Sequence, residues 1–306
     1  PWPRASAGMA PAPSMQPPCA RIDFHVDDEW APLVQFLRRM EPVLLSAAQR
    51  PGSVDLRECA YFGPFATAVL GAQVKYNLLA KRRLHIRFPV GPPQLLNYTR
   101  YSGLKHWVGA GAPPDPGHPD SETVPLTSFD AVLWGLASEV VQLISRHIDI
   151  SPDEEDALQL CFTEVGQNIA DHARSPVGGI FAARYIAQRR RIRVAIVDRG
   201  DGIAATLGRQ HPSLRQSRAA IDAVLQGGVS ARTLSRNRGL GVSHLRETVV
   251  RMGGELVLAS GDSAVHVGAG GSMQWASPGV RCPGTAIFFV LPVSDSSSDP
   301  SGRVAS

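Results

Sequence analysis

The chain has 306 residues, of which 43% are hydrophobic and 19% are charged, and its net charge is +4. This composition is typical of a globular protein with a sizeable core, and the length predicts two domains. No apolar run approaches the roughly 18 residues that a membrane-spanning helix needs. We therefore expect a cytoplasmic protein that does not contact a membrane.

The four cysteines, Cys19, Cys59, Cys161 and Cys282, are far apart in the sequence. Their spacing argues against a zinc site or a disulfide framework and indicates a reducing compartment. Residues 1–18 are rich in proline and lack the apolar segment of a secretory signal, so we expect a disordered leader there.

Basic residues cluster at Arg189, Arg190, Arg191 and Arg193. The cluster fits either a solvated hairpin turn between two strands or a patch that binds nucleic acid. No aromatic residues alternate with the arginines, as a platform for stacking bases would require. We therefore expect the hairpin turn, and no nucleic-acid partner.

The first part of the chain alternates between strand-like and helix-like segments, which predicts a small α/β domain over residues 20–108 with a largely parallel sheet. In chain order we expect a strand at 21–26, a helix at 29–47, a strand at 53–59, a helix at 64–82, a strand at 84–90 and a helix at 93–107.

A proline-rich segment at 109–126 predicts an interdomain linker, and residues 294–306 predict a disordered tail. Between them, residues 127–293 predict an α+β domain in which helices cover a mostly antiparallel sheet. Ser151 and Glu154 predict a capping box at the start of its second helix. In chain order we expect helices at 128–148 and from 151 to about 173, strands at 178–187 and 192–198, a helix near 214–226, a helix ending at Gly253, and strands at 255–260, 264–268 and 285–292.

Three polar residues, Glu164, Asn168 and His172, recur at a spacing of four in the second of these helices. This spacing places them along one edge of a helix. A carboxylate and an amide oxygen on one edge are suited to Mg²⁺ that keeps several waters, although a solvated polar face would have the same pattern.

Asp198 ends an apolar strand and is followed by Gly200, Gly202 and Ile203. An acidic residue at this point can accept a hydrogen bond from an exocyclic amine such as that of adenine. The glycines would let the backbone approach a flat ring closely, or would simply form a tight turn.

Residues Gly239, Leu240, Gly241 and Val242 come at the start of a helix. The free backbone N–H groups of a helix start suit a polyphosphate, but a glycine pair there also serves as a helix cap. The later glycine-rich segment 268–272 lacks the Lys-Ser/Thr of a phosphate loop, so we expect a hairpin turn.

In this order, and together with Thr285 at the start of the last strand, these motifs resemble the Bergerat-fold (GHKL) ATPases. That superfamily includes gyrase, the heat-shock-90 chaperones, histidine kinases and MutL. The resemblance covers about residues 128–293 and is greatest for the anti-sigma-factor serine kinases. It implies a Bergerat-fold α/β sandwich preceded by a smaller domain.

The resemblance implies that the chain binds ATP and Mg²⁺. Asn168 would ligate the metal, Asp198 would bind the adenine amino group with help from Thr285, and Glu164 would orient or deprotonate the attacking hydroxyl. His172 would belong to the site or would have a structural role at the helix end. The other implied nucleotide-binding residues are Gly200, Gly202, Ile203, Arg238, Gly239, Leu240, Gly241 and Val242. Segment 204–238 would be the lid, with Arg232, Arg236 or Arg238 meeting the phosphates.

The first domain resembles the STAS-like antagonists of anti-sigma factors around residues 54–70, although a generic α/β domain is the alternative. Where those antagonists offer a serine for phosphorylation, this chain has Gly63, Pro64 and Phe65, and only Thr67 supplies a hydroxyl.

Three functions follow from these expectations. The first is an ATP-dependent conformational switch in bacterial-type signalling, which would act on a regulatory protein partner or within a homodimer and could hydrolyse ATP. The second is a serine/threonine protein kinase that acts on an antagonist-like partner. The third is a non-catalytic interaction protein that senses nucleotide.

Overall fold

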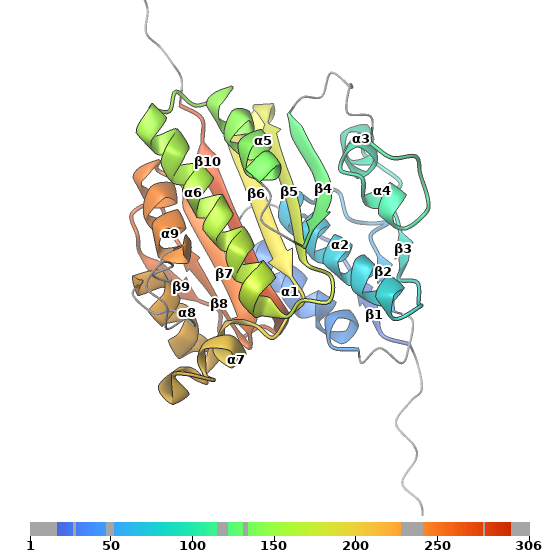
Figure 1. Ribbon diagram of the computed structural model, residues 1–306. Helices are drawn as coiled ribbons and strands as arrows, with labels where there is room; N and C mark the ends of the chain where they lie inside the picture. The colour runs from blue at the N-terminus through green and yellow to red at the C-terminus, as the bar shows by residue number, and fades with distance from the viewer. Residues whose placement is uncertain are drawn as a thin grey trace, which may run out of the picture.

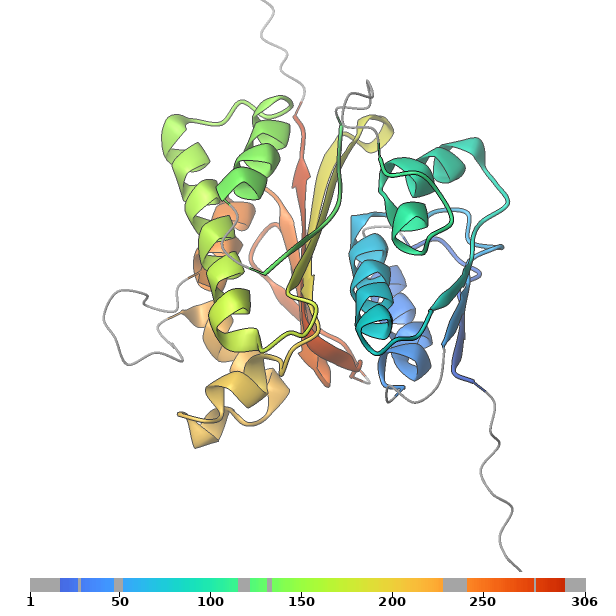
Figure 2. The same ribbon diagram turned by 45° about the vertical axis from the view of Figure 1, so that its right-hand side comes forward.

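The computed structural model describes residues 17–26, 29–46, 52–114, 122–130, 134–227, 241–277 and 279–294. Most of the expected leader 1–18 and of the expected tail 294–306 lies outside these ranges. Figures 1 and 2 show the described elements as stacked layers. A large sheet has helices on both faces, and a small sheet lies beyond one of these helix layers.

The large sheet is antiparallel throughout, as expected for the second part of the chain, and its strand order is β4-β5-β6-β10-β7-β8-β9. Side chains alternate between its two faces. In β10, Ile287 and Phe289 belong to one hydrophobic cluster, whereas Phe288 and Val290 belong to the other. Because both faces are covered, the central strands are nearly continuous apolar runs. The strands are β4 (Thr123–Phe129), β5 (Gly179–Ile186), β6 (Arg191–Asp198), β7 (Glu255–Gly261), β8 (Ser263–Val267), β9 (Met273–Trp275) and β10 (Cys282–Pro292).

One face of this sheet is covered by α5 (Trp134–Ser145), α6 (Pro152–Asn168) and α9 (Gly241–Arg251) (Figure 1). The capping box expected at the start of α6 is confirmed. Glu154 N–H donates to Ser151 Oγ at 3.3 Å, and Ser151 N–H donates to the Glu154 carboxylate at 2.9 Å. The α6 helix continues into a single π-helical turn, Ile169–Ala173. The short α7 (Ile203–Leu207) and α8 (Ser217–Gln226) follow the end of β6.

The opposite face is covered by α1 (Trp30–Leu44) and α2 (Pro64–Leu79), from the first part of the chain (Figure 2). Beyond them lies a parallel sheet of β1 (Cys19–Arg21), β2 (Ser53–Asp55) and β3 (His85–Arg87), in that order. The expected parallel α/β arrangement is therefore confirmed, but the strands are shorter, and the expected strand 21–26 is wrong in place because β1 ends at Arg21. It also contains α3 (Pro93–Tyr101) and α4 (Leu104–Trp107). Residues 64–74 of α2 are all buried, so this part of the helix is enclosed between the two sheets, whereas Leu78 and Leu79 at its carboxyl end are exposed.

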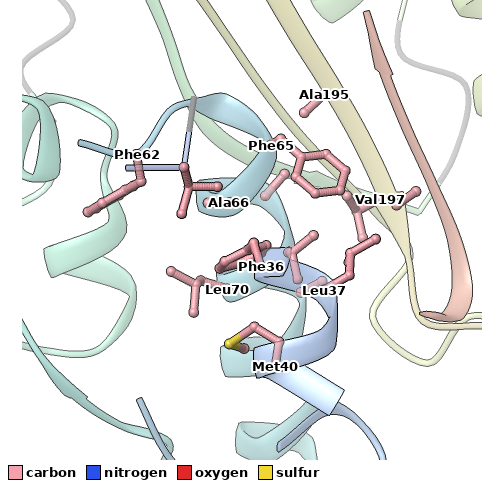
Figure 3. Packing of buried hydrophobic residues seen from close by; sticks show 14 of the residues in the cluster. Phe36, Leu37, Met40, Phe62, Phe65, Ala66, Leu70, Ala195 and Val197 are labelled. Carbon is pink, nitrogen blue, oxygen red and sulfur yellow. The ribbon is translucent and has the colours of Figure 1, made fainter. Parts of the chain in front are cut away.

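The two parts of the chain share one core. Figure 3 shows Phe65 of α2 and Leu37 of α1 facing Ala195 and Val197 of β6. Phe65 also meets Phe288 of β10 edge to face, at a ring-centroid distance of 5.6 Å. The first part of the chain is thus a structural layer of the second part.

The start of the second part differs from expectation. The expected linker 109–126 is wrong at its carboxyl end, and the expected helix 128–148 is wrong at its start, because Thr123–Phe129 form the edge strand β4 and the helix begins at Trp134. The ring of Phe129 lies over its strand partner Gly179, where an added Cβ would come within 2.1 Å of the ring. This cross-strand contact holds the segment in the sheet.

The hairpin turn expected at the arginine cluster is confirmed for Arg189 and Arg190, because Ile186 of β5 pairs with Arg191 of β6 around a short 3₁₀ turn. It is wrong for Arg193, which lies within β6 and is fully buried, with its guanidinium donating to the Tyr61 hydroxyl.

Thr67 is fully buried, and its hydroxyl donates to Gly63 O at 2.9 Å and lies 3.0 Å from the Tyr98 hydroxyl. None of the helices in the described ranges combines the length and the apolar composition that a membrane crossing requires.

Candidate functional site

A cavity lies between α6 with its π-helical turn, the α7 and α8 helices, the start of α9, and strands β6 and β10. We call it the central cavity. Its volume is about 110 Å³. It is lined by Val165, Asn168, Ile169, His172, Ala173, Ile196, Asp198, Gly202, Ile203, Thr206, Leu207, Val224, Val242, Thr285 and Ile287.

The cavity contains seven of the residues expected at the site, and these come from all four motifs. They are Asn168, His172, Asp198, Gly202, Ile203, Val242 and Thr285. Gly200, Gly241 and Glu164 lie beside it. Arg238, Gly239 and Leu240, and the other lid arginines Arg232 and Arg236, lie outside the described residues.

Asp198 is the most deeply buried acidic group of the cavity, with 2% of its surface exposed. Its Oδ1 accepts a hydrogen bond from Gly200 N–H at 2.7 Å, and the hydroxyl and backbone N–H of Thr285 also donate to the carboxylate. Burial raises the pKa of the Asp198 carboxyl to about 6, although these hydrogen bonds act in the opposite direction. The result is an acceptor in an otherwise mostly apolar cavity.

Two glycines allow close packing beside Asp198. Gly284 has a φ of +83°, and an added Cβ there would lie 2.7 Å from Asp198 Oδ1. Gly202 has a φ of +79°, and a Cβ there would lie 2.9 Å from Ser260 Oγ. Both positions therefore require glycine for conformation and for space.

Ser260 at the end of β7 connects these two glycine segments. Its buried hydroxyl donates to Gly284 O at 2.8 Å and accepts from Ile203 N–H at 2.9 Å. Sequence reasoning did not select Ser260. The only sequence signal was a single serine at the end of an apolar strand.

The edge of α6 meets the start of α9 next to the cavity. An added Cβ on Gly241 would lie 2.8 Å from the Cβ of Glu164 and 3.5 Å from Asn168 Nδ2. Glu164 Oε2 is buried, has no hydrogen-bond partner among the described residues, and lies 4.0 Å from His244 Nδ1. Glu164 and Asn168 therefore share one edge of α6, as their spacing predicted, and this edge faces the first turn of α9.

The cavity walls are largely apolar, and sequence reasoning assigned several of their residues only to packing. Val165 of α6, Ile169 of the π-helical turn, Ile196 of β6 and Ile287 of β10 line the cavity as well as the core. The expected lid 204–238 is helical over α7 and α8, and Leu225 of α8 is fully buried. That part of the segment is packed in the core and is not a free loop.

Among the described residues, no group of three or more His, Cys, Asp or Glu side chains could hold a metal ion. Mg²⁺ in nucleotide sites is commonly held by one or two protein oxygens together with phosphates and waters. A single amide oxygen such as that of Asn168 fits this mode of binding. No protein-family model matches the chain, and no curated protein sequence matches it.

Proposed function

We propose that the central cavity binds Mg-ATP and that the chain is a GHKL-type regulatory protein with a STAS-like first domain. In this proposal nucleotide acts as a conformational switch. The main supporting observation is that Asn168, Asp198, Val242 and Thr285 belong to four separate sequence motifs and line one cavity. Such a convergence of motifs is expected of a ligand site and is not required by packing alone.

The buried carboxylate of Asp198 supports adenine as the base. It accepts N–H donors and stands among apolar walls, and an adenine ring offers an exocyclic N–H donor on a flat apolar body. Thr285 donates to the same carboxylate and so holds it in place. Gly202 lines the cavity beside this carboxylate without a side chain that would occupy it.

The α6 edge supports the phosphate end of the ligand. Asn168 would offer its amide oxygen to Mg²⁺, which when bound would neutralise the phosphate charge. The start of α9 would offer backbone N–H groups to the phosphates. Both features lie at the junction of α6 and α9, where Gly241 allows close contact.

Glu164 supports a chemical step. In that step the attacking oxygen forms a bond to the γ-phosphorus, the bond to the bridging oxygen breaks with its electron pair leaving on ADP, and the hydroxyl proton passes to the Glu164 carboxylate. Water as nucleophile gives ATP hydrolysis. A serine or threonine hydroxyl of a partner gives a protein kinase, and the burial of Thr67 favours a partner over that internal site.

Calorimetric titration of the full chain with Mg-ATP tests the proposal. We expect one site per chain, and at least about tenfold weaker binding for Asn168→Ala, because a ligand oxygen is lost. The exposed Asn97→Ala on α3 is the matched control and should bind like the wild type. Absence of heat with the wild type, or equal affinity for Asn168→Ala, would remove the proposal.

Incubation with γ-labelled ATP separates the reactions. Label on an added antagonist-like partner indicates the kinase, free phosphate indicates the ATPase, and binding without either product indicates a nucleotide sensor. We expect Glu164→Ala to abolish product formation, whereas Glu155→Ala, on the exposed surface of the same helix, leaves it unchanged.

A further inference from the structure

Arg199 follows Asp198 directly, at the point where β6 ends. Asp198 lines the central cavity, whereas the Arg199 side chain extends to the opposite side of the sheet, where α1 and α2 pack. This opposition is what the alternation of an extended chain produces. Arg199 is 8% exposed, so its guanidinium is buried between the two parts of the chain.

The guanidinium has two partners in the first part of the chain. Its Nη2 donates to the carbonyl oxygen of Leu44, the last residue of α1, at 2.9 Å. Its carbon lies 4.7 Å from the ring centre of Tyr76 in α2. A cation is favourable at a helix carboxyl end and over an aromatic face. Both contacts therefore connect Arg199 to helices of the first part of the chain.

The backbone of Arg199 belongs to the segment that holds Asp198 in place. We call residues 198–202 the Asp198 loop. Arg199 N–H donates to Ser175 Oγ at 3.1 Å, Asp201 N–H donates to Ala173 O at 2.7 Å, and Gly200 N–H donates to Asp198 itself. The loop is thus fixed on one side by the residues after α6, and on the other side by the Arg199 side chain.

We infer that Arg199 is a positioning residue: it fixes the Asp198 loop against α1 and α2, so that the first part of the chain sets the affinity of the cavity for an adenine nucleotide. This inference rests on the proposed function. Coupling between two sites is reciprocal, so a nucleotide that fixes the Asp198 loop also stabilises the packing of α1 and α2 against the large sheet. The first part of the chain then senses the occupied cavity through one side chain.

Other arginines cross the same boundary without touching the Asp198 loop, and they provide matched controls. Arg184 of β5 lies 4.6 Å from the ring centre of Tyr98. On the surface, Arg281 lies 3.6 Å from Glu41 of α1. Loss of the Arg184 side chain should weaken the packing between the two parts of the chain. Loss of the exposed Arg281–Glu41 ion pair should change the stability little.

The test is calorimetric titration of the full chain with Mg-ATP and with Mg-ADP. We expect the Kd of Arg199→Ala to rise about tenfold for both nucleotides, because the loop acts on the base that they share. Arg199→Lys should recover part of the loss, since lysine can donate to Leu44 O but lacks the planar group that stacks on Tyr76. We expect Tyr76→Phe, which keeps the ring, to bind like the wild type.

Thermal unfolding of the same variants separates positioning from general loosening. We expect Arg184→Ala to lower Tm while its Kd stays within twofold of the wild type, and Arg281→Ala to change neither. If Arg199→Ala unfolds, Arg199→Lys and Tyr76→Leu carry the test and should each weaken binding severalfold.

Two results would overturn the inference while leaving the proposed function intact. One is an unchanged Kd in folded Arg199 variants, and the other is equal weakening by Arg184→Ala and Arg199→Ala. Failure of the wild type to bind either nucleotide would instead remove the proposed function, and this inference with it.

Discussion

Asp198→Asn should stabilise the protein while removing its ability to bind the ligand. Burial raises the pKa of Asp198 from 3.8 to about 6, so the ionised carboxylate disfavours the folded state at neutral pH. At about 1.4 kcal/mol per pKa unit, this penalty is about 3 kcal/mol. Asparagine has no charge, but it offers one acceptor fewer to Gly200 and Thr285, which costs about 1 kcal/mol. The expected net gain is about 2 kcal/mol.

The gain should depend on pH with a defined sign. Between pH 4 and 6 the folded state keeps the Asp198 proton that the unfolded state has released, so the free energy of unfolding of the wild type falls as pH rises through this window. The advantage of Asp198→Asn over the wild type should therefore be greatest above pH 7 and should disappear near pH 4.

Urea unfolding at pH 8 and at pH 4.5 measures this difference. Asp156→Asn on the exposed face of α6 is the matched control, for which we expect no comparable gain. The reasoning is refuted if Asp198→Asn is less stable than the wild type at pH 8, or if its advantage is the same at both pH values. A gain in stability together with loss of ligand binding is the pattern of a residue retained for function.

Two further predictions concern the turn beside Asp198. Gly284→Ala should lower the free energy of unfolding by at least about 1 kcal/mol, because φ is +83° and the new Cβ would lie 2.7 Å from Asp198 Oδ1. In urea unfolding Gly270→Ala, which has nothing within 4 Å, is the control, and equal stability of the two variants would contradict the reasoning. Ser260→Ala should cost about 1–3 kcal/mol in the same assay, because it leaves Gly284 O and Ile203 N–H without their partner. Ser263→Ala, at the start of β8, should cost less, and a cost for Ser260→Ala no greater than this control would contradict the assigned role.

The site residues that sequence reasoning found share one property, which is that short local motifs carry them. The spacing of the glycines after Asp198 indicates a turn at a strand end, and the spacing of Glu164 and Asn168 indicates one edge of a helix. The fold brings Asp198 and Asn168 to one cavity. These residues could be predicted from the sequence because a strand end and a helix edge are local structures.

The residues that sequence reasoning missed act through contacts between distant segments. Ser260 connects Gly284 with Ile203, and Arg199 reaches Leu44 of α1. Nothing in the local sequence of either residue indicates its partner. The roles of such residues can be recognised only from the tertiary structure.

The same limit applies to the fold. Most elements of both parts were predicted with their correct types. The exceptions are β1, which ends at Arg21 where the predicted strand begins, the division of the predicted helix 93–107 into α3 and α4, and the regions around β4, β9 and the short α7. At β4 the sequence predicted the end of a linker and the start of a helix, whereas the pairing of Phe129 with Gly179 places this segment in the sheet. The helix α2 was predicted, but not that its residues 64–74 are buried between two sheets and unite the parts in one core.

The base specificity of nucleotide binding tests the central claim most directly, because it depends on Asp198 as an acceptor for an exocyclic amine. In titrations of the wild-type chain, we expect Mg-ATP to bind at least about tenfold more tightly than Mg-GTP, whose base has a carbonyl oxygen where adenine has its amine. Equal affinity for the two nucleotides, or no binding of Mg-ATP, would contradict the account.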